Sequence, residues 1–363
     1  MKAAVLNSYS SQFDVEDIEI DAPRGREVMV QVRASGLCHS DLHLTAAEFE
    51  IPLPAVFGHE LAGVVAELGP DCREFSPGDH VVAALIQSCG HCAPCTGGQT
   101  YRCAHPEETV RPQDGVQRLS RGRAPVFGVF GTAAFAEYAL VHENQLVKVP
   151  DEIPFPQACV LGCSTITGAG AALNTAAVRA GESVVVLGTG GVGLNVISGA
   201  RLAGAVQIIA VDLQASKEAL ARRFGATDFI HAENIDVTEA VRAVSNGGAD
   251  HVFEVIGLKA TSELALKLAR QGGGVYMIGV HRPGRPIQID VTPELIDRQL
   301  TVKGVFMGST NIRRDIPMYA RLYLQGRLNL DDLISKQISI SEINAAYDEL
   351  RNGTIARSVI TSF

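Results

Sequence analysis

The sequence has no apolar run near the ~18 residues that a membrane-spanning helix needs. The segment Met1 to Leu6 has a strand pattern and lacks the apolar region and cleavage site of a signal peptide, so we expect it to be part of the fold. Internal repeats and low-complexity tracts are also absent. Cations cluster only between Arg118 and Arg123, and the net charge of −9 argues against a nucleic-acid partner. We therefore expect a cytoplasmic protein with neither a membrane nor a nucleic acid as partner.

The composition is that of a folded protein with more than one domain. The chain has 363 residues, of which 46% are hydrophobic and 20% charged. This length is comfortable for two domains, and the composition is globular rather than disordered. In a reducing compartment, the eight cysteines are better explained as metal ligands than as disulfides.

Three short motifs carry metal-binding side chains. The first, Cys-His-Ser-Asp-Leu-His from Cys38 to His43, follows an alternating segment that predicts a strand. Alone it is compatible with an ordinary loop. A zinc site becomes the better interpretation once two later motifs are considered: His59, with Glu60 beside it, and Cys163. Two cysteines and one histidine form a recognised catalytic zinc set with an open fourth position, and Cys38, His59 and Cys163 would supply it. Asp41 and Glu60 are candidates to orient the ligands from a second shell.

Four further cysteines lie close together in the sequence, at positions 89, 92, 95 and 103. Short Gly- and Pro-containing spacers let such thiolates converge on one tetrahedral zinc. That site would be structural, since it has no vacant position. The alternative is a surface loop that happens to be rich in cysteine. The polar stretch 104–134 that follows predicts a long lobe of loops.

A dinucleotide-binding pattern begins after the apolar run Val184 to Leu187. That run leads into a glycine-rich turn, Gly188 to Gly193, which has the GxGxxG pattern. A helical stretch follows the turn, and the next strand ends at Asp212, 19 residues beyond Gly193. An acid here pairs with the ribose hydroxyls and repels a 2′-phosphate, which favours NAD over NADP. Lys217 is a candidate second ribose contact. The predicted coenzyme contacts of the turn and of a later strand end are Gly188, Gly190, Gly191, Val192, Gly193, Ile278 and Val280.

Taken together, these motifs resemble those of the zinc-dependent medium-chain alcohol dehydrogenases over essentially the whole chain. The resemblance implies an α/β protein with a GroES-like, β-rich catalytic domain and a Rossmann domain with a doubly wound parallel sheet. The implied domains are 1–164, with a structural zinc lobe at about 88–104, then 165–306 for NAD, and 307–363 as the last part of the catalytic domain. The resemblance also implies a homodimer or homotetramer.

The resemblance assigns a role to each motif. It implies two zincs per subunit, one catalytic and one structural; their ligands are Cys38, His59 and Cys163, and Cys89, Cys92, Cys95 and Cys103. Ser40 matches the hydroxyl that takes the alcohol proton, and His43 matches the base that passes it to solvent. His39 and Arg357 match contacts to the coenzyme pyrophosphate. The zinc favours loss of the alcohol proton, and hydride then passes to the nicotinamide.

The residues predicted to line the substrate pocket indicate an apolar alcohol as substrate. By position, the pocket is expected to be lined by Leu85, Val129, Phe130, Val280 and Phe306. These side chains fit a hydrophobic primary alcohol, whether aryl, allylic or aliphatic, oxidised to its aldehyde (EC 1.1.1.-, most similar to 1.1.1.1). An alternative on the same scaffold is a thiol-adduct-dependent formaldehyde dehydrogenase, although Phe49 stands about where that subgroup carries an acid. A non-catalytic NAD-binding zinc protein and a zinc hydrolase are weaker alternatives.

Overall fold

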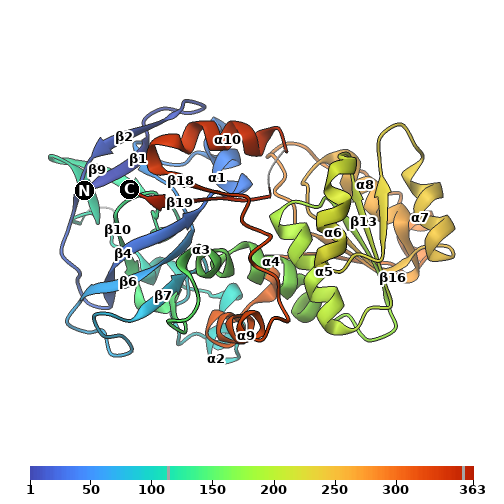
Figure 1. Ribbon diagram of the computed structural model, residues 1–363, viewed down its shortest axis with the longest axis horizontal. Helices are drawn as coiled ribbons and strands as arrows, with labels where there is room; N and C mark the ends of the chain where they lie inside the picture. The colour runs from blue at the N-terminus through green and yellow to red at the C-terminus, as the bar shows by residue number, and fades with distance from the viewer. Residues whose placement is uncertain (113–114, 354–355) are drawn as a thin grey trace. The chain divides into compact units, whose positions relative to one another are not determined.

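The computed structural model describes residues 1–112, 115–353 and 356–363, and the chain divides into two compact units. One, here named the β-rich unit, comprises Met1–Ser164 and Thr310–Phe363. The other, named the parallel-sheet unit, comprises Thr165–Ser309. Both ends of the chain therefore belong to the same unit (Figure 1).

Two sheets form the β-rich unit. The order of the first is β2-β1-β5-β9-β8-β3, with bounds β1 Lys2–Leu6, β2 Phe13–Asp17, β3 Glu19–Ile20, β5 Ala55–Val56, β8 Leu119–Arg121 and β9 Ala124–Gly128. The order of the second is β11-β7-β6-β4-β19-β18, with β10 also paired to β4. Its bounds are β4 Glu27–Gly36, β6 Glu60–Leu68, β7 His80–Ala83, β10 Tyr138–His142, β11 Leu146–Lys148, β18 Lys336–Ser339 and β19 Ser358–Ser362.

Strand β4 shows why this unit folds as it does. Val28, Val30 and Val32 alternate with more accessible residues and belong to one buried cluster, as expected for a strand with one face on a core. The C-terminal strand β19 pairs antiparallel with the end of β4, where Val359 lies opposite Gly36. The end of the chain is thereby held beside the residues that lead into the Cys38 motif.

Short helices connect these strands. They are α1 His39–Leu44, η1 Ala47–Phe49, α2 Ala93–Thr96, η2 Thr100–Arg102, η3 Pro106–Thr109, η4 Val129–Gly131, η5 Glu143–Gln145, α3 Phe155–Cys159, η6 Val160–Gly162, α9 Ile312–Leu324, η11 Ile340–Glu342 and α10 Ile343–Arg351. The prediction of loops throughout 104–134 is wrong in part. Strands β8 and β9 form a hairpin there, turned at Gly122 with φ +61°. Positions 113 and 114 of that stretch lie outside the described residues.

The parallel-sheet unit contains a sheet of order β14-β13-β12-β15-β16-β17, in which each neighbouring pair is parallel. Numbered along this unit, the order is 3-2-1-4-5-6, the doubly wound Rossmann arrangement. The strands are β12 Ser183–Leu187, β13 Gln207–Asp212, β14 Asp228–His231, β15 Ala249–Glu254, β16 Ala269–Met277 and β17 Thr301–Gly304. The helices are α4 Ser164–Gly170, η7 Ala171–Thr175, α5 Gly191–Ala203, η8 Ala215–Lys217, α6 Glu218–Phe224, α7 Val237–Ser245, α8 Lys259–Leu268, η9 Val291–Ile296 and η10 Met307–Ser309.

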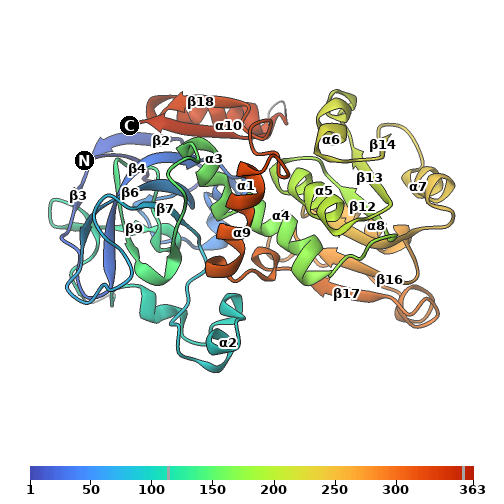
Figure 2. The ribbon, with the colours of Figure 1, turned by 60° about the horizontal axis from the view of Figure 1, so that its bottom comes forward.

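Strand β12 is buried on both faces, which explains its unbroken apolar sequence. Val185 and Leu187 pack in one cluster with residues of α7 and α8. Val184 and Val186 alternate with them and so point to the opposite face, yet they are also fully buried. Helix α5 contacts β12 and β13 and lies beside α6 (Figure 2).

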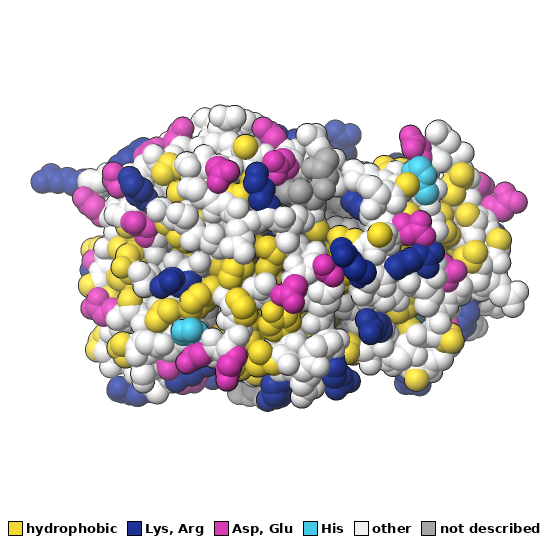
Figure 3. All heavy atoms as spheres, in the orientation of Figure 1, with side chains coloured by type: hydrophobic (Ala, Val, Ile, Leu, Met, Phe, Trp, Pro, Cys, Tyr) yellow, Lys and Arg dark blue, Asp and Glu magenta, His cyan; other side chains and the backbone are white. Residues whose placement is uncertain are grey.

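The surface charges are mixed. On the face shown in Figure 3, cationic and anionic side chains are interspersed rather than separated. Among the described residues, no helix has both the length and the apolar character that crossing a membrane requires.

Candidate metal and coenzyme sites

The three predicted catalytic zinc ligands meet inside the β-rich unit. The Sγ atoms of Cys38 and Cys163 and a ring nitrogen of His59 all lie within 4.8 Å of one another, and all three residues are buried. Cys38 immediately precedes α1, His59 precedes β6, and Cys163 follows η6. Three separate segments therefore place one donor each around a common point.

The imidazole of His59 is oriented by a buried acid. Its Nδ1 lies 3.0 Å from Oδ1 of Asp41, which also accepts a hydrogen bond of 3.3 Å from the Gly58 backbone N–H. Burial alone would lower the pKa of His59, but the Asp41 carboxylate outweighs it and raises that pKa well above its usual value. Because Asp41 engages Nδ1, Nε2 is the nitrogen left for a ligand on the other side of the ring.

The pKa values of the two thiols in the cluster, Cys38 and Cys163, are shifted in opposite directions. A hydrogen bond with Cys163 holds the pKa of Cys38 well below its usual range, although burial opposes this. The same hydrogen bond, together with burial, raises the pKa of Cys163. The thiolate form is therefore favoured at Cys38 and disfavoured at Cys163, and a divalent cation is the kind of group that would stabilise both as thiolates.

A buried ion pair lies behind the cluster. An Oε1 of Glu60 is 3.3 Å from a terminal nitrogen of Arg357, whose other terminal nitrogen donates to the Leu37 carbonyl at 2.6 Å. Burial raises the pKa of Glu60 to about 7, with Arg357 acting in the opposite direction. Oδ2 of Asp41 and Oε2 of Glu60 are buried without a hydrogen-bond partner. Two orphaned carboxylate oxygens around two thiols and an imidazole fit a cation at this place.

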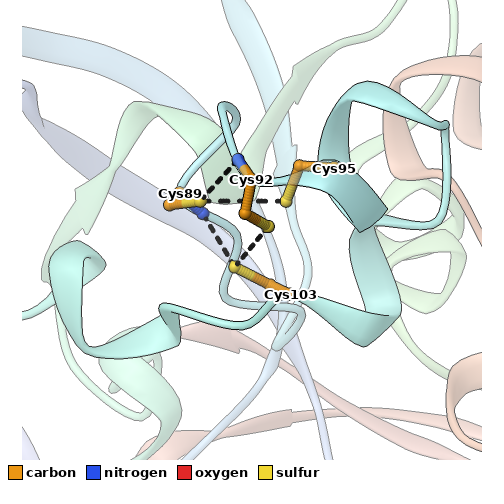
Figure 4. Close-up of side chains that lie close together, drawn as sticks. All are labelled: Cys89, Cys92, Cys95 and Cys103. Carbon is orange, nitrogen blue, oxygen red and sulfur yellow. Dashed lines mark hydrogen bonds between the residues drawn. The ribbon is translucent and has the colours of Figure 1, made fainter.

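The four clustered cysteines form a second candidate site, and their side chains point toward one another (Figure 4). All four Sγ atoms lie within 4.8 Å of one another, with Cys89 and Cys95 4.0 Å apart and Cys92 and Cys103 3.9 Å apart. A tetrahedral zinc with Zn–S bonds of about 2.3 Å sets its sulfurs roughly 3.8 Å apart. The observed spacings fit such an ion.

Backbone amides prepare these sulfurs for negative charge. The Cys89 N–H donates to Sγ of Cys103 at 3.2 Å, the His105 N–H donates to the same atom at 3.3 Å, and the Cys92 N–H donates to Sγ of Cys89 at 3.4 Å. Backbone hydrogen bonds also lower the pKa of Cys92 to about 6. All eight cysteines lie in the described residues, and all are free thiols.

The glycine turn of the parallel-sheet unit has the close approaches that the dinucleotide motif requires. Gly188 has φ +97°, and a Cβ at Gly193 would lie 1.9 Å from the Gly188 carbonyl oxygen. A Cβ at Gly190 would instead meet nothing within 4 Å, so the turn is open there. A strand, this turn and the N-terminus of α5 follow in order, as in sites that hold a pyrophosphate.

The acid at the end of β13 is held by a residue of that turn. Oδ2 of Asp212 accepts from Thr189 twice, from the N–H at 2.8 Å and from Oγ1 at 2.7 Å, and from Nζ of Lys217 at 3.1 Å. Oδ1 accepts from the Gln214 N–H at 3.0 Å. Burial would raise the pKa of Asp212, but the Thr189 hydrogen bonds outweigh it and lower that pKa. The carboxylate therefore remains charged.

Comparisons with known proteins show the family of the chain. The family models "Alcohol dehydrogenase GroES-like domain" and "Zinc-binding dehydrogenase" match residues 24–151 and 191–325. The chain is 35% identical to S-(hydroxymethyl)glutathione dehydrogenase of Paracoccus denitrificans over 99% of both chains. The chain belongs to the zinc-dependent medium-chain alcohol dehydrogenases. The family, the fold class and the zinc and nicotinamide cofactors expected from the sequence are thereby confirmed.

Solved structures of the family have the same fold over their whole length. A zinc-binding alcohol dehydrogenase domain protein from Burkholderia ambifaria is 37% identical with a TM-score of 0.94, covering 100% of this chain and 98% of its own. Benzyl alcohol dehydrogenase from Acinetobacter calcoaceticus is 33% identical with a TM-score of 0.93, covering 100% of this chain and 99% of its own. Both family domains are thus present in one chain.

The predicted proton-relay residues share helix α1. Ser40 Oγ lies 3.1 Å from Sγ of Cys38 and 3.3 Å from Nε2 of His59, directly against the candidate metal cluster. His43 is three residues further along the helix, and its ring contacts that of exposed His39 edge-on with centroids 6.5 Å apart. The structure thus brings Ser40 to the cluster and places His43 beside His39. Their roles remain predictions.

The predicted pocket residues are shared between the two units. Val129 and Phe130 lie in η4 of the β-rich unit, and the Phe130 ring contacts that of His59 edge-on, with centroids 5.6 Å apart. Leu85, half-buried, follows β7. Val280 and Phe306 belong to the parallel-sheet unit, where they are exposed, and their place in the pocket stays a prediction. Ile278 follows β16 and donates its N–H to the Glu254 carbonyl at 2.8 Å.

Two features of the sites were missed from the sequence. Thr189 holds Asp212, the acid predicted to bind the ribose, although it lies 23 residues before it; a hydroxyl inside the glycine turn is the signal that could have indicated this. Arg357, predicted as a pyrophosphate contact, is itself buried and paired with Glu60. That pairing joins residues almost three hundred positions apart, and no local sequence pattern marks it.

Proposed function

We propose that this protein is an NAD-dependent zinc alcohol dehydrogenase that interconverts a primary, hydrophobic alcohol and its aldehyde. The convergence of Cys38, His59 and Cys163, with Asp41 behind the imidazole and Ser40 against the cluster, carries the proposal. In this assignment, residues 1–164 and 307–363 provide the metal and substrate site, and residues 165–306 bind the coenzyme. The four-cysteine site holds a second, structural zinc.

Each residue near the cluster has a definite task in this reaction. When bound, zinc acts as a Lewis acid that makes the substrate hydroxyl easier to deprotonate. Asp41 fixes the tautomer and orientation of His59, so that Nε2 faces the metal side. Ser40, whose hydroxyl already lies within hydrogen-bonding distance of two ligand atoms, accepts the substrate proton and passes it toward His43. His39 and Arg357 are proposed to contact the pyrophosphate of the coenzyme.

The coenzyme is proposed to be NAD rather than NADP. The lowered pKa of Asp212 keeps a negative charge where a 2′-phosphate would bind, and this repels NADP. Lys217 lies against that same carboxylate, so its charge is already neutralised by an acid and is less able to attract a phosphate. Gly188 to Gly193 supply the backbone amides for the pyrophosphate. Ile278 and Val280, beyond β16, are proposed to contact the nicotinamide.

Two substrate classes are compatible with the relatives. One relative is named for benzyl alcohol and another for S-(hydroxymethyl)glutathione, so similarity alone favours neither. We favour the apolar alcohol, because Leu85, Val129 and Phe130 offer no group that recognises the carboxylates of glutathione. The thiol-adduct formaldehyde dehydrogenase is the second candidate. A non-catalytic zinc protein is disfavoured, since it leaves Ser40 and the orphaned carboxylate oxygens without a task.

We further propose a homodimer or homotetramer in the cytoplasm. Strand β17 (Thr301–Gly304) is at the edge of the parallel sheet and all four of its residues are exposed. Val291, Ile296 and Phe306 nearby are large apolar side chains that are more than half exposed. An unpaired edge with apolar neighbours supports pairing with a second copy. Eight free thiols suit a reducing compartment.

Turnover assays test this proposal. Zinc-loaded protein is given NAD or NADP with benzyl alcohol, allyl alcohol or 1-hexanol, and reduced coenzyme is measured. We expect turnover with NAD on all three. Formaldehyde is then offered with and without glutathione. Activity that requires glutathione and is absent with the three alcohols would favour the second candidate, and absence of any turnover would contradict both.

A further inference from the structure

A third group of metal-binding side chains lies beside the four clustered cysteines. A ring nitrogen of His91, a carboxylate oxygen of Glu108 and Sγ of Cys89 all lie within 4.8 Å of one another. His91 and Glu108 also contact each other directly, with Nε2 and Oε2 2.7 Å apart. The proposed function gives neither of these two residues a task.

The three donors can close around one zinc ion. An imidazole, a carboxylate and a thiolate on a tetrahedral zinc have their donor atoms roughly 3.3–3.6 Å apart. Cys89 is buried, whereas the side chains of His91 and Glu108 are 64% and 45% exposed. The two exposed side chains can therefore move the short distance that an ion between the donors requires. Three protein ligands leave the fourth position to water, so the ion can still exchange a ligand.

This group also connects solvent to the four-cysteine site. Cys89 belongs to both sets of donors, and its Sγ lies 4.0 Å from that of buried Cys95 (Figure 4). His91 lies between Cys89 and Cys92 in the sequence, and its exposed ring is open to solvent. An ion held by His91, Glu108 and Cys89 is therefore reachable from solvent and already bonded to one of its final ligands.

Negative charge at this point favours the arrival of a cation. Glu107 and Glu108 are consecutive, and both are exposed. Acidic side chains that focus the field in this way raise the association rate of a counter-ion by roughly 10–10³-fold. The two acids differ in their contacts, because Oε1 of Glu107 lies 3.5 Å from Nδ1 of His105 rather than against His91. General attraction and direct binding can therefore be tested separately.

We propose that His91, Glu108 and Cys89 form a transfer site through which zinc enters and leaves the four-cysteine site. The inference rests on the structural zinc of the proposed function and adds the route by which that ion is exchanged. Zinc first binds His91 and Glu108, and Cys89 then joins as a thiolate. The other three cysteines in turn displace the remaining water, the imidazole and the carboxylate. Each of the four thiols releases one proton to solvent as its sulfur–zinc bond forms.

A transfer site changes rates and leaves the final equilibrium alone. His91 and Glu108 are not ligands of the final site, so loss of either should leave its zinc affinity unchanged. Uptake and release must then slow by the same factor, because the ratio of their rate constants sets the affinity. A residue that merely stabilised the fold around the cysteines would instead lower the affinity and speed release.

Zinc-exchange kinetics measure this directly. Metal-free full-length protein is mixed with zinc, and uptake is followed with a chromophoric chelator; zinc-loaded protein is mixed with excess chelator to follow release. Both measurements are repeated in a C38S chain, which should record the four-cysteine site alone. In H91N and E108Q we expect both rate constants to fall at least about tenfold, because loss of even a partner behind a ligand costs 10–100-fold in metal affinity. Equilibrium zinc content should remain native.

E107Q is the matched control, because it removes the same charge from the adjacent position without removing a donor of the transfer site. It should change both rate constants far less. Native rates in H91N and E108Q, or an E107Q variant as slow as E108Q, overturn the inference while the structural zinc stands. A lower zinc affinity with unchanged uptake also overturns it. A C38S chain that takes up no zinc would contradict both the structural zinc and the inference.

Discussion

The Asp41–His59 hydrogen bond offers a sharp test of the metal site. In the native protein, Oδ1 of Asp41 lies 3.0 Å from Nδ1 of His59. Replacement of Asp41 by Asn keeps the size of the side chain and an oxygen that can accept from this Nδ1, but it removes the negative charge. Both residues are fully buried, so no solvent compensates for that charge. Loss of a partner behind a metal-binding histidine typically costs 10–100-fold in metal affinity, or roughly 1.4–2.7 kcal/mol.

The assay is competition for zinc. Metal-free protein is equilibrated with zinc buffered by a chelator, and zinc per chain is measured as the free concentration rises. In D41N we expect the curve for one of two zincs to shift to about 10–100-fold higher free zinc, while the other is unchanged. D17N is the matched control, because Asp17 is 80% exposed. An unchanged curve for both zincs in D41N would refute the reasoning.

Three further predictions concern other parts of the molecule. T189V removes one charge-assisted hydrogen bond to Asp212. We expect a KM for NAD about tenfold higher and a smaller preference for NAD over NADP, both restored in T189S. An unchanged preference for NAD would contradict the role of Thr189 in holding Asp212. C103S opens the four-cysteine site, and we expect one zinc fewer per chain with a lower Tm; retention of two zincs would count against that site. His142, with its pKa lowered to about 4 by burial and then by Arg26, binds a proton less readily folded than unfolded, so stability should fall as pH drops from about 6.5 toward 4. H142N should reduce that fall in chemical denaturation, and an identical pH dependence would contradict the assignment.

The sequence predicted best those features that depend on neighbouring residues. The four cysteines lie within fifteen positions, so the loop between them limits where each thiolate can go. The glycine turn is likewise set by one strand and the helix that follows it. In each case the geometry is decided by backbone constraints within a short segment, and these can be read from residue types.

Long-range partners could not be read in this way. Cys163 was grouped with Cys38 and His59 because two cysteines and one histidine form a recognised zinc set, and the family resemblance gave the same set. No spacing rule relates residues more than one hundred positions apart, so their convergence could not be read from the sequence. The Glu60–Arg357 pair depends on β19 returning to β4. The hairpin β8–β9 was missed because Arg121, Arg123 and Pro125 obscure the alternation that buries Leu119 and Val126.

Zinc content of a C38S variant tests the central claim most directly. The native protein should bind two zincs per chain and reduce NAD with a primary alcohol. C38S should bind one zinc, keep NAD binding because its glycine turn is intact, and lose alcohol-dependent NADH formation. If C38S retained two zincs and native turnover, Cys38, His59 and Cys163 would not be the catalytic metal centre.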